Sequence, residues 1–395
     1  MIYEYPDYYK EFHCIGGVCK DSCCAGWEVD IDDDTAEMYK NVPLPIGDRL
    51  REKLIGDRSH YRFKLCPDKR CPFLNSDQLC DIILAMGQGG LSVTCTEYPR
   101  YTIETPFYQL TDLTLSCPEA SRIFFSTEDP VTYEEREEEY HDTDWEEDPF
   151  SDEDFDEEDS EDEDFDFDEC PDDDTEDSAG GSKENEGNYS EADSADDMYD
   201  SAEDPKEREQ RLAADKARLD RVLALRRDVM KILKDRSLPI SERDRRIAAL
   251  FGENPDQLSA GTRAEDELLL EKLMAMEEVN PDWHEIKLSL SSNLKKVEDR
   301  ADRLLSEGGP WLWNRLERFR SYLYFRYTIE IYEGKDPGQV LRFIRRCCRF
   351  LDLLLAEWCL SHDADLIPQT ALEDRARIFS RQVEHSRENV EDLLF

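Results

Sequence analysis

Cysteines are concentrated in the first third of the chain, and this concentration constrains the fold more than any other feature of the sequence. Nine of the 13 cysteines lie between positions 14 and 117, namely Cys14, Cys19, Cys23, Cys24, Cys66, Cys71, Cys80, Cys95 and Cys117. Exposed free thiols are reactive, so a stable fold at this density has to pair them or share them among metal ions. We therefore expect a loop-rich segment organised either by disulfides or by an inorganic centre.

The cellular compartment bears on that choice. Residues 1–7 contain neither the basic stretch nor the apolar stretch of a secretory signal. No uncharged apolar run reaches the roughly 18 residues expected of a membrane-spanning helix. The sequence thus predicts a cytoplasmic protein without a membrane partner. Thiols stay reduced in the cytoplasm, which favours metal ligation over disulfides.

The spacing of the cysteines narrows the kind of inorganic centre. They follow C-x4-C-x3-C-C, then C-x4-C, and then gaps of 8, 14 and 21 residues. None of these is the C-x2-C knuckle of common zinc modules. Loose spacing, with glycine and proline beside the sulfurs, favours an iron–sulfur cluster. Two separate sites, a zinc site, and buried structural cysteines with some disulfides remain as alternatives.

Negative charge is concentrated in one later segment. Residues 126–205 contain 40 acidic and 2 basic residues, whereas the rest of the chain contains 56 acidic and 47 basic residues. Such a segment has too little apolar surface to offset the entropy of ordering and the repulsion among its carboxylates. We predict a disordered acidic insertion that includes Cys170. The mildly acidic remainder argues against nucleic acid as a partner, because phosphate binding needs a basic surface.

After the insertion, apolar residues recur at helical spacing to the end of the chain. This pattern predicts helices from Lys206 and from Ser241, and others over 263–278, 283–306, 310–333, 338–361 and 369–391. Earlier in the chain we expect an extended segment at 27–32, short helices at 34–40 and 47–54, and a helix within 107–126. The predicted fold is mainly α. A loop-rich, cysteine-dense metal-binding domain over 1–125 packs on an α-helical domain over 206–395, with the disordered insertion 126–205 between them.

Six motifs of the cysteine-rich segment share a pattern with a known protein family. They are Tyr9-x-x-Phe12-x-Cys14, Asp21-Ser22-Cys23-Cys24-x-Gly26-Trp27-x-Val29-x-Ile31-Asp32, Cys71-Pro72-Phe73-Leu74, Cys80-x-Ile82, Ser92-x-Thr94-Cys95-x-x-Tyr98-Pro99-Arg100 and Ser116-Cys117-Pro118-Glu119-Ala120. Two later stretches fit the same pattern, Tyr322-Leu323-Tyr324-Phe325-Arg326 and Ser380-Arg381-Gln382-Val383-Glu384-His385-Ser386. In these stretches the chain resembles the flagellin lysine N-methylases of bacterial flagellar biosynthesis, over about residues 1–125 and more thinly over 310–390.

The resemblance implies an enzyme that transfers methyl groups from S-adenosylmethionine to lysine side chains of flagellin. It also implies a [4Fe–4S] cluster bound by some of the nine cysteines, without selecting which of them. The acidic insertion departs from the family pattern. The alternative is a non-enzymatic iron- or zinc-binding protein, or an electron-transfer protein, that shares only the cysteine framework.

Methylation of an amine needs a deprotonated lysine held in line with the sulfonium methyl group, and in principle no metal. Glu384 and His385, with Arg381 one helical turn earlier, are the candidate catalytic residues, although a histidine among charges on a terminal helix also suits a surface or packing role.

The cofactor site is less constrained by the sequence. The chain has no glycine-rich nucleotide loop between a strand and a helix. The candidate cofactor-binding residues are therefore Tyr98 and Arg100, close after Cys95, and Gly89 and Gly90 in a turn. The cluster would be either structural or a binding point for the amino and carboxylate groups of S-adenosylmethionine.

Overall fold

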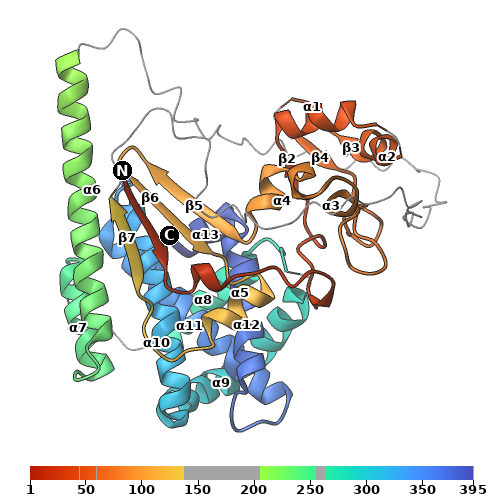
Figure 1. The fold of residues 1–395 in the computed structure, drawn as a ribbon. Coiled ribbons are helices and arrows are strands. Elements are labelled where there is room, and N and C mark those ends of the chain that lie inside the picture. Colours follow the sequence, from red (N-terminus) through yellow and green to blue (C-terminus); the bar gives the residue numbers. More distant parts are fainter. Residues whose placement is uncertain (44, 59, 138–204, 255–262, 281, 395) are drawn as a thin grey trace.

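A computed structural model describes residues 1–43, 45–58, 60–137, 205–254, 263–280 and 282–394 (Figure 1). The second half is helical, as predicted. Its helices are α6 (Pro205–Lys234), α7 (Ile240–Leu250), α8 (Arg263–Ala275), α9 (Trp283–Glu307), α10 (Gly309–Tyr327), α11 (Pro337–Ser361), α12 (Gln369–Glu384) and α13 (Arg387–Leu394). Among these described helices, none combines the length and the apolar character needed to cross a membrane.

Three of the predicted helices are shorter than expected, and the one predicted over 263–278 ends at Ala275. The helix predicted over 310–333 ends at Tyr327 and continues as a 3-10 turn, η6 (Thr328–Ile331). The helix predicted over 369–391 is broken after Glu384, because Ser386 starts α13 by accepting a hydrogen bond from the backbone N–H of Asn389 at 3.2 Å. The break places His385 in a bend between two helices.

Helix α11 lies at the centre of the helical part. Asp336 caps its first turn by accepting from the backbone N–H of Gln339 at 3.1 Å, and Pro337 occupies the first helical position. Its apolar face is fully buried against α9, α10 and α12, with Phe343 and Phe350 in the core.

The first third of the chain contributes a sheet that the sequence analysis did not predict. Four strands, β1 (Ile2–Pro6), β5 (Arg100–Thr105), β6 (Tyr108–Leu113) and β7 (Tyr133–Glu137), form a sheet in the order β5-β6-β1-β7. Strands β1 and β6 are parallel, and the other pairs are antiparallel. The sheet packs beside α6 and α10 (Figure 1).

Two predictions are corrected by this sheet. The helix expected within 107–126 is a strand, β6, followed by a shorter helix, α5 (Pro118–Phe124), because Tyr108, Leu110 and Asp112 alternate into the interior. The predicted disorder of 126–205 does not hold for its beginning, since β7 pairs with β1 and Glu134 accepts from the Tyr5 hydroxyl at 2.7 Å. Residues 138–204 lie outside the described residues.

A smaller unit is built from residues 30–97. It contains β2 (Asp30–Ile31), α1 (Asp33–Asn41), α2 (Ile46–Lys53), β3 (Leu54–Ile55), β4 (Tyr61–Phe63), α3 (Asp81–Met86) and α4 (Val93–Glu97), with the strands in the order β2-β4-β3. Its own core surrounds Tyr39, Phe63 and Phe73. This unit confirms the two short helices and the extended segment near residue 30, and it lies to one side of the sheet and helices (Figure 1).

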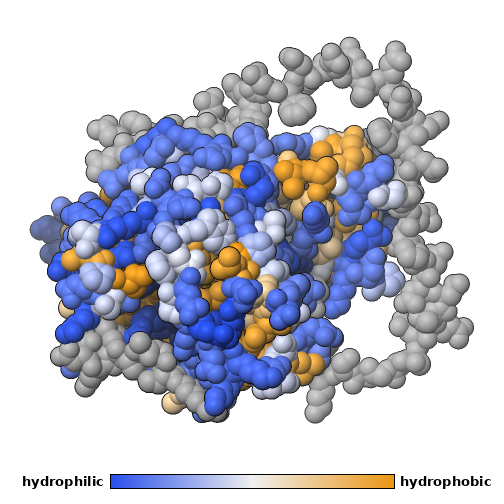
Figure 2. All heavy atoms as spheres, turned by 90° about the horizontal axis from the view of Figure 1, so that it is seen from below, coloured by the Kyte–Doolittle hydropathy of each residue, from blue (hydrophilic) through white to orange (hydrophobic). Residues whose placement is uncertain are grey.

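The main core joins the beginning of the chain to its end. Tyr8, Phe12, Leu115 and Phe124 are buried in one cluster with residues of α9 to α13. The face seen from below is largely hydrophilic, with separate hydrophobic patches (Figure 2). Through the buried cluster, the cysteine-rich segment and the helices share one hydrophobic core.

Candidate functional site

Eight cysteines of the first third carry free thiols, and they fall into two sets. Within each set, the thiols lie close enough to change one another's pKa. The first thiol set is Cys14, Cys19, Cys23 and Cys117, and the second thiol set is Cys24, Cys71, Cys80 and Cys95. The ninth predicted ligand, Cys66, is disulfide-bonded. A sulfur in a disulfide has no thiolate to offer a metal, so eight thiols remain as candidate ligands.

The second thiol set belongs to the smaller unit. The backbone N–H of Cys71 donates to the carbonyl of Cys24 at 2.7 Å, and Leu74 and Cys80 form an antiparallel bridge. Burial, and then the nearby Cys24 thiol, raises the pKa of the Cys71 thiol. Burial also raises the pKa of Cys80 to about 11, although the backbone N–H of Ile83 donates to this sulfur. Thiols in such a setting stay protonated unless a cation or a metal compensates them.

The first thiol set lies closer to the helical part. The backbone N–H of Gly16 donates to the Cys14 sulfur at 3.5 Å. Cys117 precedes α5, and burial raises the pKa of its thiol to about 11. Cys23 and Cys24 connect the two sets, because a hydrogen bond from the Cys23 thiol lowers the pKa of Cys24 to about 7.

The donor chemistry of the two sets suits an iron–sulfur cluster or zinc, both of which take cysteine thiolates. Backbone amides are directed at the sulfurs of Cys80 and Cys117, and hydrogen bonds of this kind tune the sulfurs of a cluster site. In their present side-chain conformations, the described residues form no group of three or more His, Cys, Asp or Glu arranged to hold a metal ion.

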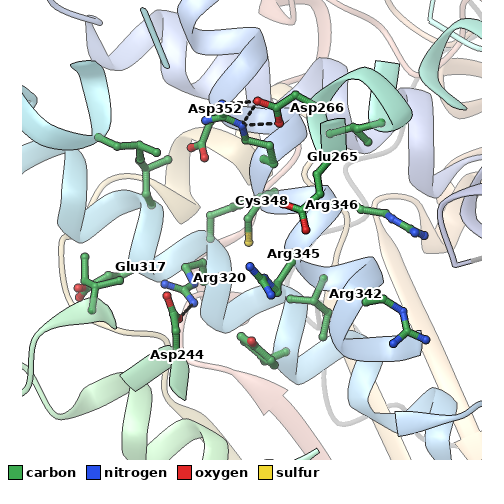
Figure 3. Close-up of a pocket in the computed structure, with 18 of the residues that line it drawn as sticks. Asp244, Glu265, Asp266, Glu317, Arg320, Arg342, Arg345, Arg346, Cys348 and Asp352 are labelled. Atoms are coloured by element: carbon green, nitrogen blue, oxygen red, sulfur yellow. Dashed lines mark hydrogen bonds and ion pairs between the residues drawn. The ribbon is translucent and has the colours of Figure 1, made fainter. Parts of the chain in front are cut away.

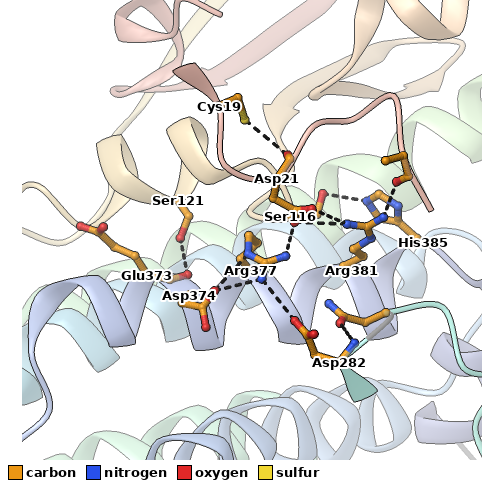
Figure 4. Close-up of polar contacts among 12 residues, drawn as sticks. Cys19, Asp21, Ser116, Ser121, Asp282, Glu373, Asp374, Arg377, Arg381 and His385 are labelled. Atoms are coloured by element: carbon orange, nitrogen blue, oxygen red, sulfur yellow. Dashed lines mark hydrogen bonds and ion pairs between the residues drawn. The ribbon is translucent and has the colours of Figure 1, made fainter. Parts of the chain in front are cut away.

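Arg381, on α12, binds the loop of residues 21–25, called the cysteine loop below. Its guanidinium donates to the Asp21 carboxylate at 3.1 Å and to the carbonyl oxygen of Ala25 at 2.6 Å (Figure 4). Arg377, one turn earlier, pairs with the same carboxylate. The contacts of Arg381 are thus those of a positioning residue, which holds residues 21–25 beside His385.

Trp27, Tyr98 and His385 form a partly exposed aromatic triad at this junction. Ring centroids are 5.7 Å apart for Trp27 and His385, 5.8 Å for Trp27 and Tyr98, and 6.2 Å for Tyr98 and His385. The indole N–H of Trp27 donates to the carbonyl of Cys23 at 2.7 Å. Aromatic faces of this kind attract an ammonium group, with a gain of about 0.5–2 kcal/mol.

His385 is neutral at neutral pH. Burial lowers its pKa to about 4, and the positive charges of Arg381 and Arg326 act in the same direction against Glu384. Its Nε2 atom lies 2.7 Å from the hydroxyl of Ser116, the residue before Cys117. A neutral imidazole beside an aromatic binding surface is able to accept a proton.

Glu384 points away from the triad into the protein interior. Its fully buried carboxylate accepts from the hydroxyls of Tyr322 at 2.9 Å and Tyr327 at 3.0 Å, and also from Ser380. Arg326 forms an ion pair with it at 3.4 Å. Glu384 and His385 therefore do not form the surface pair that their adjacency suggests.

The other predicted cofactor residues occupy different places. The guanidinium of Arg100 lies over the rings of Phe12 at 5.5 Å and Tyr9 at 5.9 Å. Gly89 and Gly90 form a 3-10 turn of the smaller unit, where the carbonyl of Gly90 accepts from the Tyr39 hydroxyl at 2.8 Å. The structure brings Tyr98, but not Arg100 or these glycines, to the aromatic triad.

Sequence reasoning missed Trp27, Thr114, Ser116 and Ser380 as site residues. Trp27, Ser116 and Ser380 belong to the motifs shared with the lysine N-methylases, and this membership could have identified them. Nothing in the sequence marks Thr114. Helix α12 and the strand–helix connection after β6 bring them together although they are far apart in the chain.

A charged cavity of about 720 Å³ lies elsewhere, among α7 to α11 (Figure 3). Arg320 pairs with Asp244 across it, and Arg349 donates to Asp266 at 2.9 Å. No residue of the aromatic triad contributes to its walls. The cavity is separate from the candidate site.

Comparison with known proteins places sequence similarity in one part of the chain. It is 28% identical over 137 residues to a lysine-N-methylase of Salmonella typhimurium, which covers 33% of this chain and 34% of that protein. The same identity and length hold for the flagellar biosynthetic protein FliU of Salmonella muenchen, of which 81% is covered. This chain thus spans about a third of the length of the lysine-N-methylase that it matches.

No family model matches the chain. No solved structure matches it either. The resemblance inferred from the cysteine motifs is nevertheless confirmed at the level of named relatives. Over about a third of its length, this chain is similar to lysine N-methylases and to a protein of flagellar biosynthesis.

Proposed function

We propose that the chain is a protein-lysine N-methyltransferase that transfers methyl groups from S-adenosylmethionine to flagellin. The aromatic triad carries this proposal, because it combines a surface for an ammonium group with a neutral imidazole at a partly exposed junction. The names of the similar proteins, a lysine-N-methylase and a flagellar biosynthetic protein, support lysine methylation and a connection with flagella. The reducing cytoplasm is the compartment that we propose for the reaction.

The substrate lysine would lie against Trp27 and Tyr98, with His385 as the base. A lysine ammonium has a pKa near 10.4 in water, so it must lose a proton before its nitrogen can attack the methyl group. The aromatic rings would hold the side chain in line, and Arg381 would keep the cysteine loop in place beside it. We assign the catalytic role to His385 and a positioning role to Arg381.

We also propose that the free thiols hold an iron–sulfur cluster, with the first thiol set nearest to the aromatic triad. If three thiols of one set held the cluster, its fourth iron would stay open to the amino and carboxylate groups of S-adenosylmethionine. Support comes from the all-thiol donor sets and the amides directed at their sulfurs.

The decisive experiment is a methylation assay on anaerobically purified protein. Flagellin is incubated with the protein and S-adenosylmethionine, and its mass is then measured. We expect a gain in steps of one methyl group, most of which is lost in His385→Ala. His284→Ala, at an exposed histidine paired with Glu278, is the matched control and should methylate normally.

Absence of any methyl gain with the wild-type chain would overturn the proposal. A second candidate function is favoured by the eight free thiols alone, namely a metal-binding or electron-transfer protein. Iron or zinc in the purified protein, together with unchanged flagellin mass, would support that second function.

A further inference from the structure

A continuous chain of hydroxyl groups connects His385 with the buried Glu384. His385 Nε2 lies 2.7 Å from Ser116 Oγ, which lies 3.0 Å from Thr114 Oγ1. Thr114 Oγ1 lies 3.0 Å from Ser380 Oγ, and Ser380 donates to Glu384 Oε2. The two residues at its ends are neighbours in sequence, yet they are joined through the segment after β6.

The number of available protons determines which hydroxyl donates and which accepts along this series of hydroxyl groups. Each hydroxyl has a single proton to donate, whereas a carboxylate only accepts. Ser380 gives its proton to Glu384, which is paired with Arg326. Ser380 must therefore accept from Thr114, and Thr114 must in turn accept from Ser116.

Ser116 consequently has no proton left for His385. It lies within hydrogen-bond distance of both the Tyr98 hydroxyl, at 3.1 Å, and His385 Nε2. Its two lone pairs accept one proton from each of them. Neutral His385 therefore carries its hydrogen on Nε2, and the lone pair of the ring lies on Nδ1.

We infer that Ser116, Thr114 and Ser380 form a proton relay that holds His385 as its Nε2–H tautomer and links it to Glu384. This inference deepens the proposed function and rests on it for the identity of the substrate amine. The three hydroxyl residues are positioning residues, because none of them touches the substrate in this scheme.

The relay gives a balanced proton transfer. Nδ1 of His385 takes a proton from the lysine ammonium, and Nε2 passes its proton to Ser116. Ser116, Thr114 and Ser380 each pass on their own proton, and Glu384 ends as a carboxylic acid. The amine is left neutral with its lone pair free. After the product departs, the reverse sequence returns the proton through Nδ1 to water, because His385 is partly exposed.

The tautomer of His385 is the direct test, and it does not depend on methylation. The full chain is labelled with 15N-histidine, and long-range 1H–15N correlations at neutral pH show which ring nitrogen carries hydrogen. The His385 signal is identified by its loss in His385→Asn. We expect the Nε2–H tautomer in the wild type, and the Nδ1–H tautomer there would overturn the relay.

Thr114→Val tests whether the chain sets this tautomer. The substitution removes one hydroxyl at nearly constant volume, so Ser116 is free to turn its proton toward Nε2. We expect the His385 signal to become a mixture of both tautomers. Thr111→Val is the matched control, because Thr111 lies on β6 and its hydroxyl faces the exposed Thr102 at 3.3 Å, away from the three hydroxyls of the relay.

Kinetics separate the relay from the proposed function itself. Thr114→Val and Ser380→Ala should each lower kcat for flagellin about tenfold or more, with KM nearly unchanged, and Thr111→Val should do neither. Ser380→Ala also replaces Thr114→Val if the latter does not fold. A pure Nε2–H signal in both relay variants, or unchanged kcat, would overturn the relay and leave the methyltransferase proposal standing. If the wild-type protein never methylates flagellin, the proposed function is overturned. The tautomer measurement would still show whether the hydroxyl groups hold His385 as its Nε2–H form.

Discussion

The Arg381 guanidinium and the Asp21 carboxylate, 3.1 Å apart, join the last long helix to the loop that carries Cys23 and Cys24. The Arg381 side chain is 7% exposed, so the contact is largely shielded from solvent. The candidate site is therefore assembled from both ends of the chain. Trp27 follows the loop, and His385 follows the helix.

Arg381→Ala should therefore weaken both stability and activity. The substitution leaves the carbonyl oxygen of Ala25 without its donor and Arg377 as the remaining partner of Asp21, and we expect a loss of about 1–3 kcal/mol in the free energy of unfolding. Urea denaturation measures this loss. Arg387→Ala is the control, since its side chain is 83% exposed and forms a surface pair with Glu391, so the change should stay below about 0.5 kcal/mol. Equal stabilities of the two variants would contradict the role given to Arg381.

The helix predicted within 107–126 is present only from Pro118, the first residue of α5, where proline suits the first turn of a helix. Strand β6 was missed because the apolar spacing over 107–126 also fits a helix, although β5 precedes it directly as an antiparallel partner, and its other partner, β1, lies about a hundred residues earlier. Arg381 was predicted to be catalytic, yet its contacts to Asp21 and Ala25 depend on docking that only the folded chain defines.

The same limit applies to the candidate site. His385 was predicted as a candidate base and lies in the aromatic triad, but Thr114 and Ser380 are 266 positions apart in sequence. A hydroxyl pair over that distance has no periodicity or spacing to mark it. The grouping of the thiols into two sets likewise follows from the turn at Cys23 and Cys24, which directs consecutive sulfurs to different neighbours.

Metal content should follow the two thiol sets. Anaerobically purified protein should contain iron and acid-labile sulfide and should show visible absorption, because free thiols of this kind ligate iron–sulfur clusters. Cys117→Ser and Cys71→Ser, one from each set, are compared with Cys348→Ser in α11, which should retain full iron content. If neither variant changes the amount of iron, zinc or sulfide bound, the thiol sets are not metal ligands.

Stability should fall as the pH rises through the range in which Asp112 titrates. Burial raises the pKa of this carboxyl from 3.8 to about 7, although Tyr8 donates a hydrogen bond to it at 2.6 Å. Between about pH 4 and 7 the folded chain therefore holds a proton that the unfolded chain has lost. The resulting loss of unfolding free energy is at most about 4 kcal/mol, at about 1.4 kcal/mol per pKa unit.

Urea denaturation from pH 5 to pH 8 measures this dependence. Asp112→Asn keeps a neutral side chain at every pH, so it should flatten the dependence and be more stable than the wild type at pH 8. Glu104→Gln, at an exposed position of the neighbouring strand β5, should leave the dependence unchanged. A wild-type chain whose stability rises between pH 5 and 7, with Asp112→Asn unchanged, would show that Asp112 is ionised in the folded state.

Truncation of Glu384 should cost more stability than its conversion to an amide. Glu384→Ala leaves the hydroxyls of Tyr322 and Tyr327 without their acceptor and the buried Arg326 without its counter-charge. We expect a loss of about 3–5 kcal/mol in the free energy of unfolding. Glu384→Gln preserves the volume and one acceptor oxygen, so it should lose less. Glu388→Ala, at an exposed position of α13, is the control and should change stability by less than about 0.5 kcal/mol. If Glu384→Ala were as stable as Glu388→Ala, this carboxylate would not be the anchor of the buried hydroxyl network, and the relay would lose its terminal acceptor.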